Sequence, residues 1–372
     1  MKILLVSFTT ETNSGWGRYT RDLARALMNE GHSVVCLNEW LKEKGLPPLH
    51  EPDDYLGYSL GWLADRKVLA RAIQEFEPDV VHIAVEPYLS LVPLVSIPKR
   101  TAIVLTVHGT YAYYPQLTPR FIRPFIKGLY VRALKRLVAI TPVSENTQRV
   151  LEELLSKNGV VKPKIQAIHN GVWLKDHALP PIPANEKNGF TILSVGAIKA
   201  RKGNYEILQG MLELRKSHGL KATYRVVGSL DDADSYVQKL KNFISENDME
   251  DQVVFTGRVT DDQVEDELRR THVIALLPRA VGNSLEGFGL VYLEANAYGV
   301  PGIGARQSAS EEAILDGKSG LLCNADDPKD IAEKLYQLSQ GVIGPEDARA
   351  WALTHDWSNI VKQYLTIYGR GA

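Results

Sequence analysis

Two glutamates, Glu286 and Glu294, enclose a run of seven residues, Gly-Phe-Gly-Leu-Val-Tyr-Leu. Gly287 and Gly289 predict a turn that opens a helix, with Leu290 on its inner face. The free backbone N–H groups and the positive dipole end of such a helix suit a diphosphate. Carboxylates bind vicinal hydroxyls by charge-assisted hydrogen bonds, so one glutamate can hold a sugar and the other a ribose. An ordinary helix start with an acidic first turn has the same spacing.

A basic cluster forms a second candidate site in the middle of the chain. Lys199, Arg201 and Lys202 follow an apolar run that ends in Gly196, which predicts a strand and then a turn. Cations in that turn can neutralise the charge that builds on a departing nucleotide diphosphate. The same residues are also typical of a solvated basic turn.

Two further features stand at the carboxyl ends of predicted strands near the start of the chain. The loop Gly15-Trp16-Gly17 lets backbone amides come close to an anion, although a plain strand–helix turn has the same composition. His108 ends a strand and precedes Gly109, which places it at the sheet edge where ligands bind. A lone histidine is also common in a structural role. The histidines show no metal-ligand spacing, and we expect no metal ion and no cofactor.

The elements that position these residues repeat one order, strand, loop, helix and strand, in each half of the chain. In the first half, apolar runs predict strands at 2–7, 33–37, 79–84, 102–108, 137–143 and 165–168. In the second half they predict strands at 191–196, 224–227, 253–255 and 273–277. An amphipathic helix at about 360–368 ends the pattern.

This repetition predicts the α/β class, with two Rossmann-like domains that face a central cleft. The 372 residues suffice for two such domains. We expect an N-terminal, acceptor-side domain at 1–172 and a proline-containing linker at 173–190. A C-terminal, donor-side domain then covers 191–356. The last helix, about 357–372, is expected to pack back on the first domain.

The motifs together resemble glycosyltransferase family 4, a large retaining family with the GT-B fold. Its signature has two glutamates separated by seven residues, with Gly-Phe-Gly after the first and Gly-x-Pro downstream, as in Glu286 to Pro301. Other matching segments are Ser14–Tyr19, His108–Gly109, Val143–Ser144, Asn170–Val172, Glu312–Gly317, Gly320–Leu322 and Asp326–Leu338. The resemblance thus covers nearly the whole chain.

The resemblance implies roles for these residues. Glu286 contacts the donor sugar and Glu294 the ribose, while the backbone of Gly287, Phe288, Gly289 and Leu290 holds phosphate oxygens. It also implies that the loop at Gly15 approaches the donor phosphate or the acceptor, that Gly196 and Lys202 lie at the donor, and that His108 lies near the sugar. We expect Lys202 and Arg201 to stabilise the leaving group. The implied activity is transfer of a hexose-type sugar from a nucleotide-diphosphate sugar to a hydroxyl of a glycan, lipid or small molecule, with retention and without a metal.

The chain departs from the family at two points. Ala197 stands where an arginine is usual, so half of the cation pair is missing there, and Lys199 or Arg201 is expected to compensate. Ser308 and Ala309 replace two glycines that lie close to the donor in many relatives. These departures bear on how tightly the donor is held.

Charge and composition limit the partners. The formal net charge of −1 favours neither nucleic acid nor membrane over the whole surface. The stretch 111–136 is nonetheless basic and aromatic, as in segments that contact anionic lipid or an anionic acceptor, although a surface helix with lysines in water fits as well. With no signal peptide, no membrane span and only two cysteines, both in apolar runs, we expect a cytoplasmic protein, with peripheral membrane contact through 111–136.

Two other interpretations remain open from the sequence. A nucleotide-sugar epimerase has the same architecture but lacks the Gly-Phe-Gly and Gly-x-Pro pattern. A catalytically decayed sugar-nucleotide-binding protein would account for Ala197. The identity of the donor base (UDP, GDP or ADP), of the sugar and of the acceptor depends on pocket residues that the motifs do not include.

Overall fold

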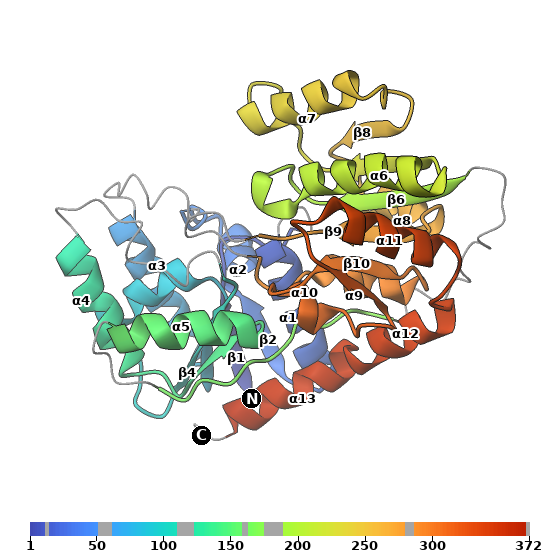
Figure 1. Cartoon of the computed structure of the whole chain (residues 1–372). Helices are drawn as coiled ribbons and strands as arrows, with labels where there is room; N and C mark the ends of the chain where they lie inside the picture. Colours follow the sequence, from blue (N-terminus) through green and yellow to red (C-terminus); the bar gives the residue numbers. More distant parts are fainter. Residues whose placement is uncertain are drawn as a thin grey trace. The chain divides into compact units, whose positions relative to one another are not determined.

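The computed structural model describes residues 1–11, 15–50, 62–109, 123–157, 163–174, 189–279 and 286–369. The chain forms two compact units. The first comprises Met1–Gly171 together with Trp357–Ala372, and the second comprises Val172–Asp356. Figure 1 shows each unit as a sheet with helices packed on it.

The described part of the first unit contains a sheet of five parallel strands in the order β2-β1-β3-β4-β5. The strands are β1 (Lys2–Val6), β2 (Ser33–Cys36), β3 (Val80–Ile83), β4 (Ala102–Val107) and β5 (Ala139–Pro142). Every residue of β3, β4 and β5 is buried, which explains why these strands are mostly apolar in the sequence. The strand order reverses between β1 and β3, and such a switch point is where open α/β sheets bind ligands.

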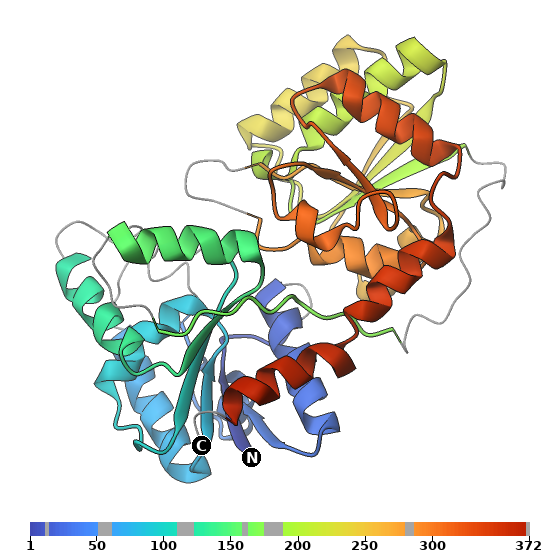
Figure 2. The same cartoon turned by 60° about the horizontal axis from the view of Figure 1, so that its bottom comes forward.

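Helices cover both faces of this sheet. They are α1 (Gly15–Asn29), α2 (Leu37–Glu43), α3 (Trp62–Phe76), the 3-10 helix η2 (Glu86–Leu94), α4 (Arg123–Leu134), α5 (Glu145–Lys157) and α13 (Trp357–Tyr368). The last helix, α13, lies beside α1 (Figure 2). It buries Trp357, Ile360, Val361, Tyr364, Ile367 and Tyr368 in the first unit.

Buried hydrogen bonds join α13 to the sheet. The Tyr364 hydroxyl lies 3.0 Å from the Tyr19 hydroxyl on α1, and the Tyr368 hydroxyl lies 2.5 Å from His82 Nδ1 on β3. Thr106 Oγ1 on β4 lies 2.8 Å from both His82 Nε2 and the Tyr19 hydroxyl. This set of residues is called the tyrosine–histidine network below. It joins α1, α13 and two strands of the sheet through buried polar groups.

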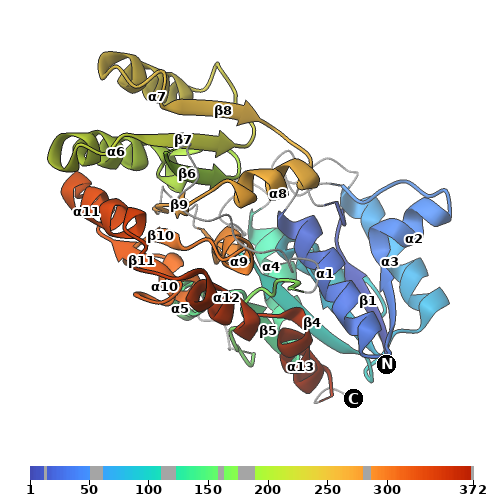
Figure 3. The same cartoon turned by 90° about the vertical axis from the view of Figure 1, so that its right-hand side faces the viewer.

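The described part of the second unit contains a sheet of six parallel strands in the order β11-β10-β9-β6-β7-β8. The strands are β6 (Phe190–Val195), β7 (Ala222–Val227), β8 (Val253–Gly257), β9 (Val273–Leu276), β10 (Gly302–Ala305) and β11 (Gly320–Cys323). The helices are η4 (Ala200–Lys202), α6 (Asn204–His218), α7 (Ser235–Glu246), α8 (Asp261–Arg269), α9 (Leu290–Ala297), α10 (Ser310–Ala313), α11 (Pro328–Ser339) and α12 (Pro345–Thr354). Figure 3 shows α6, α7 and α11 on one face of the sheet and α8 and α9 on the other.

The predicted α/β class is confirmed, since each unit is a parallel sheet of the Rossmann-like type. One predicted strand is wrong. The segment 165–168 makes only a single parallel bridge, between Ile165 and Ile140 of β5. The N–H groups of Gln166 and Ile168 donate to carbonyls of β5, but no ladder forms beyond them. The two cysteines, Cys36 and Cys323, are both free and buried.

Candidate active site

Glu286, the first glutamate of the motif, is bound by two cations from the turn that follows β6. Lys202 Nζ lies 2.8 Å from Glu286 Oε2, and the Arg201 guanidinium donates to the same oxygen. The side chains of Glu286 and Lys202 each keep 14% of their surface exposed. These three residues, the cation–glutamate cluster, are therefore packed but still open to a ligand.

The short helix η4, which carries both cations, is attached to the end of β9. The Leu277 N–H donates to the Lys202 carbonyl at 3.1 Å, and the Arg279 N–H donates to the Arg201 carbonyl at 2.9 Å. Gly203 ends η4 with a φ of 77°, and a Cβ there would lie 2.2 Å from the Leu277 carbonyl oxygen. Only glycine fits such a close approach in this conformation, so the position of both cations depends on it.

The ammonium group of Lys202 lies over the carboxyl end of β6. Its Nζ is 3.8 Å from the position that a Cβ on Gly196 would take. Gly196 directly follows β6, which is a central strand of the sheet. Ligands of open parallel sheets bind outside the carboxyl ends of the strands, so this cation stands where an anionic ligand is expected.

The electrostatics of the cluster keep Glu286 ionised. Burial raises the pKa of its carboxyl, but the charges of Lys202 and Arg201 and their hydrogen bonds outweigh burial, so the pKa lies below its ordinary value of 4.5. At neutral pH the site therefore holds a carboxylate between two cations. Such a group can accept hydrogen bonds from sugar hydroxyls while the cations bind phosphate oxygens.

The glycine-containing turn leads directly into α9, as the motif predicts. Gly289 precedes the first residue of the helix, with a φ of 91°. The Phe288 side chain is buried in the packing of the second unit, whereas Gly287 and Leu290 are half-buried. Because none of these side chains has a hydrogen-bond donor, the turn can bind a phosphate only through its backbone N–H groups.

The second glutamate, Glu294, is half-buried on α9. The helix is anchored by Tyr292, whose ring is fully buried and whose hydroxyl donates to the Leu276 carbonyl at the end of β9. The same hydroxyl lies 3.0 Å from Ser310 Oγ on α10. Through β9, α9 thus shares its anchor with η4 and the two cations.

Lys199 and Arg201, the two residues expected to compensate for Ala197, contact different carboxylates. Lys199 pairs with Asp234 at 2.9 Å, at the start of α7, and does not contact Glu286. Arg201 does contact Glu286. Of the two residues expected to compensate for Ala197, the structure therefore brings Arg201 and not Lys199 to the cluster.

Ser308, the other departure from the family, faces its own turn. Its Oγ donates to the Ala305 carbonyl at 2.7 Å and accepts from the Ser310 N–H at 3.1 Å. Ala309 is buried. The serine hydroxyl thus serves the start of α10.

Gly15 and His108 belong to the first unit. Gly15 is the first residue of α1, and the half-buried Trp16 beside it packs edge-on against Phe8, with ring centroids 5.7 Å apart. His108 directly follows β4 and packs edge-on against Tyr19 of α1, with centroids 4.7 Å apart. Both residues stand at the carboxyl end of the five-stranded sheet.

Two residues that the sequence did not single out hold these sites in place. Glu86 Oε1 accepts a hydrogen bond of 2.5 Å from the His108 N–H. Burial raises the pKa of the Glu86 carboxyl to about 7, against backbone hydrogen bonds that lower it. Arg279 pairs with Glu206 and Asp326, and its backbone bonds to Arg201. The signal for both was available, since each is a charged residue just after an apolar strand.

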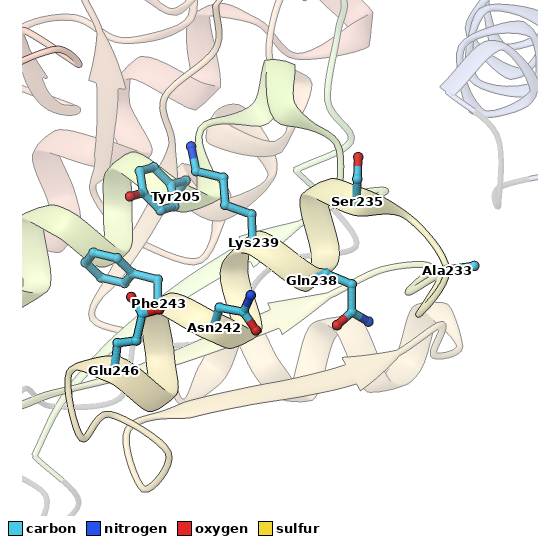
Figure 4. Close-up of a pocket in the computed structure, with 8 residues that line it drawn as sticks. All are labelled: Tyr205, Ala233, Ser235, Gln238, Lys239, Asn242, Phe243 and Glu246. Carbon is cyan, nitrogen blue, oxygen red and sulfur yellow. The ribbon is translucent and has the colours of Figure 1, made fainter.

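A surface pocket of about 620 Å³ lies between the start of α6 and α7 (Figure 4). Lys239 Nζ stands 3.5 Å from the centroid of the Tyr205 ring, and Phe243 packs edge-on against that ring. The remaining lining residues are Ala233, Ser235, Gln238, Asn242 and Glu246. None of the predicted site residues lines this pocket, so it is separate from the cation–glutamate cluster.

The residues that the structure describes contain neither a metal-site cluster nor a helix that could span a membrane. No group of three or more histidine, cysteine, aspartate or glutamate residues within them has the arrangement of a metal site. Across the same ranges, every helix is too short or too polar to pass through a bilayer.

Two known families of glycosyltransferases match this chain. Residues 13–175 match the family described as Glycosyltransferase Family 4, and residues 177–351 match the family described as Glycosyl transferases group 1. The two matches together run through both units. The chain therefore belongs to glycosyltransferase family 4.

Several curated relatives are named glycosyltransferases. The chain is 26% identical to the N-acetyl-alpha-D-glucosaminyl L-malate synthase of Bacillus anthracis over 95% of its own length and 93% of that enzyme. It is 28% identical to a D-inositol 3-phosphate glycosyltransferase of Acidothermus cellulolyticus, in a match that spans 49% of the chain and 41% of that enzyme. It is also 28% identical, over 44% of the chain and 43% of the enzyme, to a GDP-mannose-dependent mannosyltransferase of Mycolicibacterium smegmatis that acts on a phosphatidylinositol monomannoside.

Solved structures share the fold over the whole chain. HepE of Anabaena, in complex with UDP and glucose, has a TM-score of 0.73 and 18% identity, and the match covers 100% of both chains. The sucrose-phosphate synthase of Thermosynechococcus elongatus has a TM-score of 0.72 and 16% identity, with 100% of this chain and 98% of that one covered. At these identities the likeness shows the fold alone, and it confirms the predicted two-domain GT-B class.

Proposed function

We propose that the protein is a retaining, metal-independent glycosyltransferase that moves a hexose-type sugar from a nucleotide-diphosphate sugar to an acceptor hydroxyl. The observation that carries the proposal is the cation–glutamate cluster at the carboxyl ends of β6 and β9. Two cations and one ionised carboxylate there match the two halves of such a donor, a diphosphate and a polyhydroxyl ring.

The chemical work assigned to the cluster is electrostatic. As the bond between the sugar C1 and the diphosphate oxygen breaks, negative charge builds on the leaving diphosphate, and Lys202 and Arg201 stabilise it. Glu286 orients the sugar by accepting hydrogen bonds from its hydroxyls. The acceptor oxygen forms the new bond to C1 on the face that the leaving group vacates, and its proton passes to the leaving phosphate. No protein base is required in this scheme.

Several donor bases fit these contacts, so we propose to identify the base first. Thermal unfolding would be followed with UDP, GDP and ADP, each with and without EDTA. A diphosphate at about 100 times its dissociation constant stabilises the native state by roughly 2.7 kcal/mol. A single base that raises the Tm, with no effect of EDTA, supports the proposal and selects the nucleotide sugars for turnover assays. The anomeric configuration of the product then tests retention.

The decisive variant is Lys202→Ala, which we expect to lower kcat by about a hundredfold or more, as for loss of one transition-state donor. Lys199→Ala is the matched control, because it removes a lysine from the same turn that pairs with Asp234 and is 56% exposed. Near-normal turnover of Lys202→Ala contradicts the proposed role. Tight donor binding without turnover in the unaltered protein instead supports a decayed binding protein, the interpretation that Ala197 favours.

We further propose that the protein meets an anionic or lipid-linked acceptor at the inner face of a membrane through α4. Phe125 on this helix is 58% exposed, and Lys127 and Arg132 are exposed on it as well. The preceding part of the basic stretch, 111–122, lies outside the described residues. Sedimentation with vesicles that contain phosphatidylserine, compared with phosphatidylcholine alone, tests this contact, and Phe125→Ala together with Arg132→Glu should reduce it.

A further inference from the structure

The pocket between α6 and α7 lies wholly within the second unit (Figure 4). Tyr205 of α6, Ala233 in the loop before α7 and residues of α7 itself line it. Its volume of about 620 Å³ is in the usual range for small-molecule sites, roughly 300–1,000 Å³. The pocket is therefore large enough for a ligand of its own, and its walls belong to one compact unit.

One face of α7 forms most of the wall. Side chains three or four residues apart lie on the same face of a helix, and four exposed polar residues of α7 follow that spacing: Ser235, Lys239, Asn242 and Glu246. The opposite face is apolar and buries Val237, Leu240 and Ile244. Because the apolar face anchors the helix, the polar face is already in place before any ligand binds.

Tyr205 supplies a rigid aromatic surface. Its backbone N–H donates to the Tyr236 hydroxyl at 3.0 Å, and Phe243 packs edge-on against its ring with centroids 5.1 Å apart. Lys239 Nζ stands over the ring, 3.5 Å from its centroid (Figure 4). Since an exposed lysine reaches the ring face, a ligand can reach it too once that side chain moves. The face of an aromatic ring is electron-rich and suits the weakly positive C–H groups of a sugar ring.

The polar groups of the pocket have unused hydrogen-bonding capacity. Within the residues that the structure describes, the side chains of Ser235, Asn242 and Glu246 make no hydrogen bond and no ion pair. A hydroxyl and an amide can each donate and accept, and a carboxylate accepts. Sugar hydroxyls also donate and accept. The set therefore matches a ligand with several neighbouring hydroxyl groups.

The charges of the pocket favour an uncharged ligand. Lys239 and Glu246 carry opposite charges and stand seven residues apart on α7, which is about 10 Å along a helix. An anion in the pocket would meet the carboxylate as well as the ammonium group, and a cation would meet both as well. Neither sign of charge is thus preferred.

We propose that this pocket binds a short uncharged oligosaccharide. One sugar ring packs on Tyr205 after Lys239 moves aside, and Asn242 and Glu246 bind its hydroxyls. An exposed cation–π contact shifts an equilibrium by only about two- to fivefold, so a ligand can displace the lysine. The inference goes beyond the proposed function, because it assigns a second carbohydrate site at which no sugar is transferred.

Binding is measured by isothermal titration calorimetry of the full chain with maltotetraose, cellotetraose and N,N′,N″,N‴-tetraacetylchitotetraose. We expect one of them to bind at a single site and Tyr205→Ala to weaken that binding by about tenfold. Tyr336→Ala is the matched control, because it removes a half-buried tyrosine that stacks on His218 and does not line the pocket. No binding of the three, or equal losses in both variants, overturns the proposal.

Lys239→Ala distinguishes an uncharged ligand from an anionic one. Removing the side chain uncovers the Tyr205 ring, so the oligosaccharide should bind about two- to fivefold more tightly. Tetragalacturonate, an anionic oligosaccharide, serves as the comparison ligand and should bind no better than the uncharged ones. Loss of binding in Lys239→Ala, or preference for tetragalacturonate, overturns the proposal in favour of an anionic ligand.

Asn242→Ala tests the contacts with the hydroxyls. The side chain is exposed and makes no contact with a described residue that its loss would break, so the thermal unfolding of this variant should match that of the unaltered protein. We expect the oligosaccharide to bind about three- to tenfold more weakly, as for loss of one or two hydrogen bonds. Unchanged affinity would overturn the assigned contacts.

Failure of the proposed function is distinguishable from failure of this inference. The titrations contain no nucleotide sugar, and no residue of the cation–glutamate cluster lines the pocket. A protein that transfers no sugar but binds the oligosaccharide through Tyr205 refutes the proposed function alone. A protein that transfers sugar but binds none of the tested oligosaccharides in this pocket refutes the present inference alone.

Discussion

Two glutamates, one buried in the first unit and one half-buried in the second, have pKa values displaced in opposite directions. Burial raises the pKa of Glu86 to about 7, because its hydrogen-bond partners are backbone amides and supply no charge. Burial also acts on Glu286, but Lys202 and Arg201 outweigh it and the pKa lies below 4.5. Backbone dipoles alone thus leave the pKa of a buried carboxyl near 7, whereas nearby full positive charges keep the pKa low and the carboxyl ionised.

The difference extends to the surroundings of each glutamate. Near Glu86 the polar groups of the first unit are hydroxyls and imidazoles, and burial lowers the pKa of His82 to about 3. Around Glu286 the second unit presents two cations. The first unit therefore surrounds its glutamate with uncharged groups, whereas the second pairs its glutamate with two full charges.

The largest expected effect comes from removing the charge in the second unit. Glu286→Gln should lower kcat/KM by about 10²–10³-fold, or roughly 2.7–4 kcal/mol, because it removes the negative charge that pairs with both cations and turns one accepting oxygen into a donor. Steady-state kinetics with the selected donor measure this.

A matched control is available in the same unit. Glu267 pairs with Arg225 through two hydrogen bonds of 2.5 and 2.6 Å and is similarly buried. Glu267→Gln should lower stability and spare kcat/KM. Equal losses of activity in both variants would show that Glu286 acts through folding alone.

The second effect concerns the pH dependence of stability and belongs to Glu86. In the unfolded chain this carboxyl ionises near 4.5, and in the native state near 7. The native state therefore keeps the proton longer, and its stability falls as the pH rises from 4.5 to 7. This contribution amounts to at most about 3 kcal/mol.

Glu86→Gln should lack that contribution. The quantity to plot against pH is therefore the difference in unfolding free energy between the unaltered protein and Glu86→Gln. His82 and His108 have lowered pKa values and give a slope of the opposite sign, but they are present in both proteins and cancel. Urea unfolding at a series of pH values measures it. A difference that does not vary with pH would contradict the raised pKa.

The smallest effect is expected in the tyrosine–histidine network. Tyr364→Phe removes the hydroxyl that lies against Tyr19, while Tyr19 keeps its bond to Thr106. We expect a loss of about 1 kcal/mol in unfolding free energy. Tyr336→Phe in α11 is the control, since no hydrogen bond joins that hydroxyl to a described residue. Equal stability of the two variants would show that the network contributes nothing.

Much of the architecture could be predicted from the sequence because parallel strands buried on both faces consist mostly of apolar residues. β3, β4 and β6 are examples, and the turn before α9 was marked by Gly287 and Gly289. The segment 165–168 misled for the same reason, since it is apolar and extended but pairs at one residue only.

The supporting contacts could not be predicted, because they join residues that are distant in the sequence. Glu86 reaches the amide of His108 only because β3 and β4 are neighbours in the sheet. Likewise, Lys199 and Arg201 lie in the same turn, but Lys199 pairs with Asp234 and Arg201 with Glu286. Sequence patterns indicate which residue types occur at a site. Which of them contact one another depends on the register and order of the strands in the sheet.

The return of α13 to the first unit has a consequence for biosynthesis. A ribosome delivers this chain from its N-terminus, so the whole second unit emerges before α13 does. Until then Tyr19 and His82 have no partners from the last helix, and the apolar positions that Trp357 and Ile360 fill stay open to water. The unit that is made first is thus completed last, and a chain that stops just before Trp357 would carry a finished second unit and an unfinished first one.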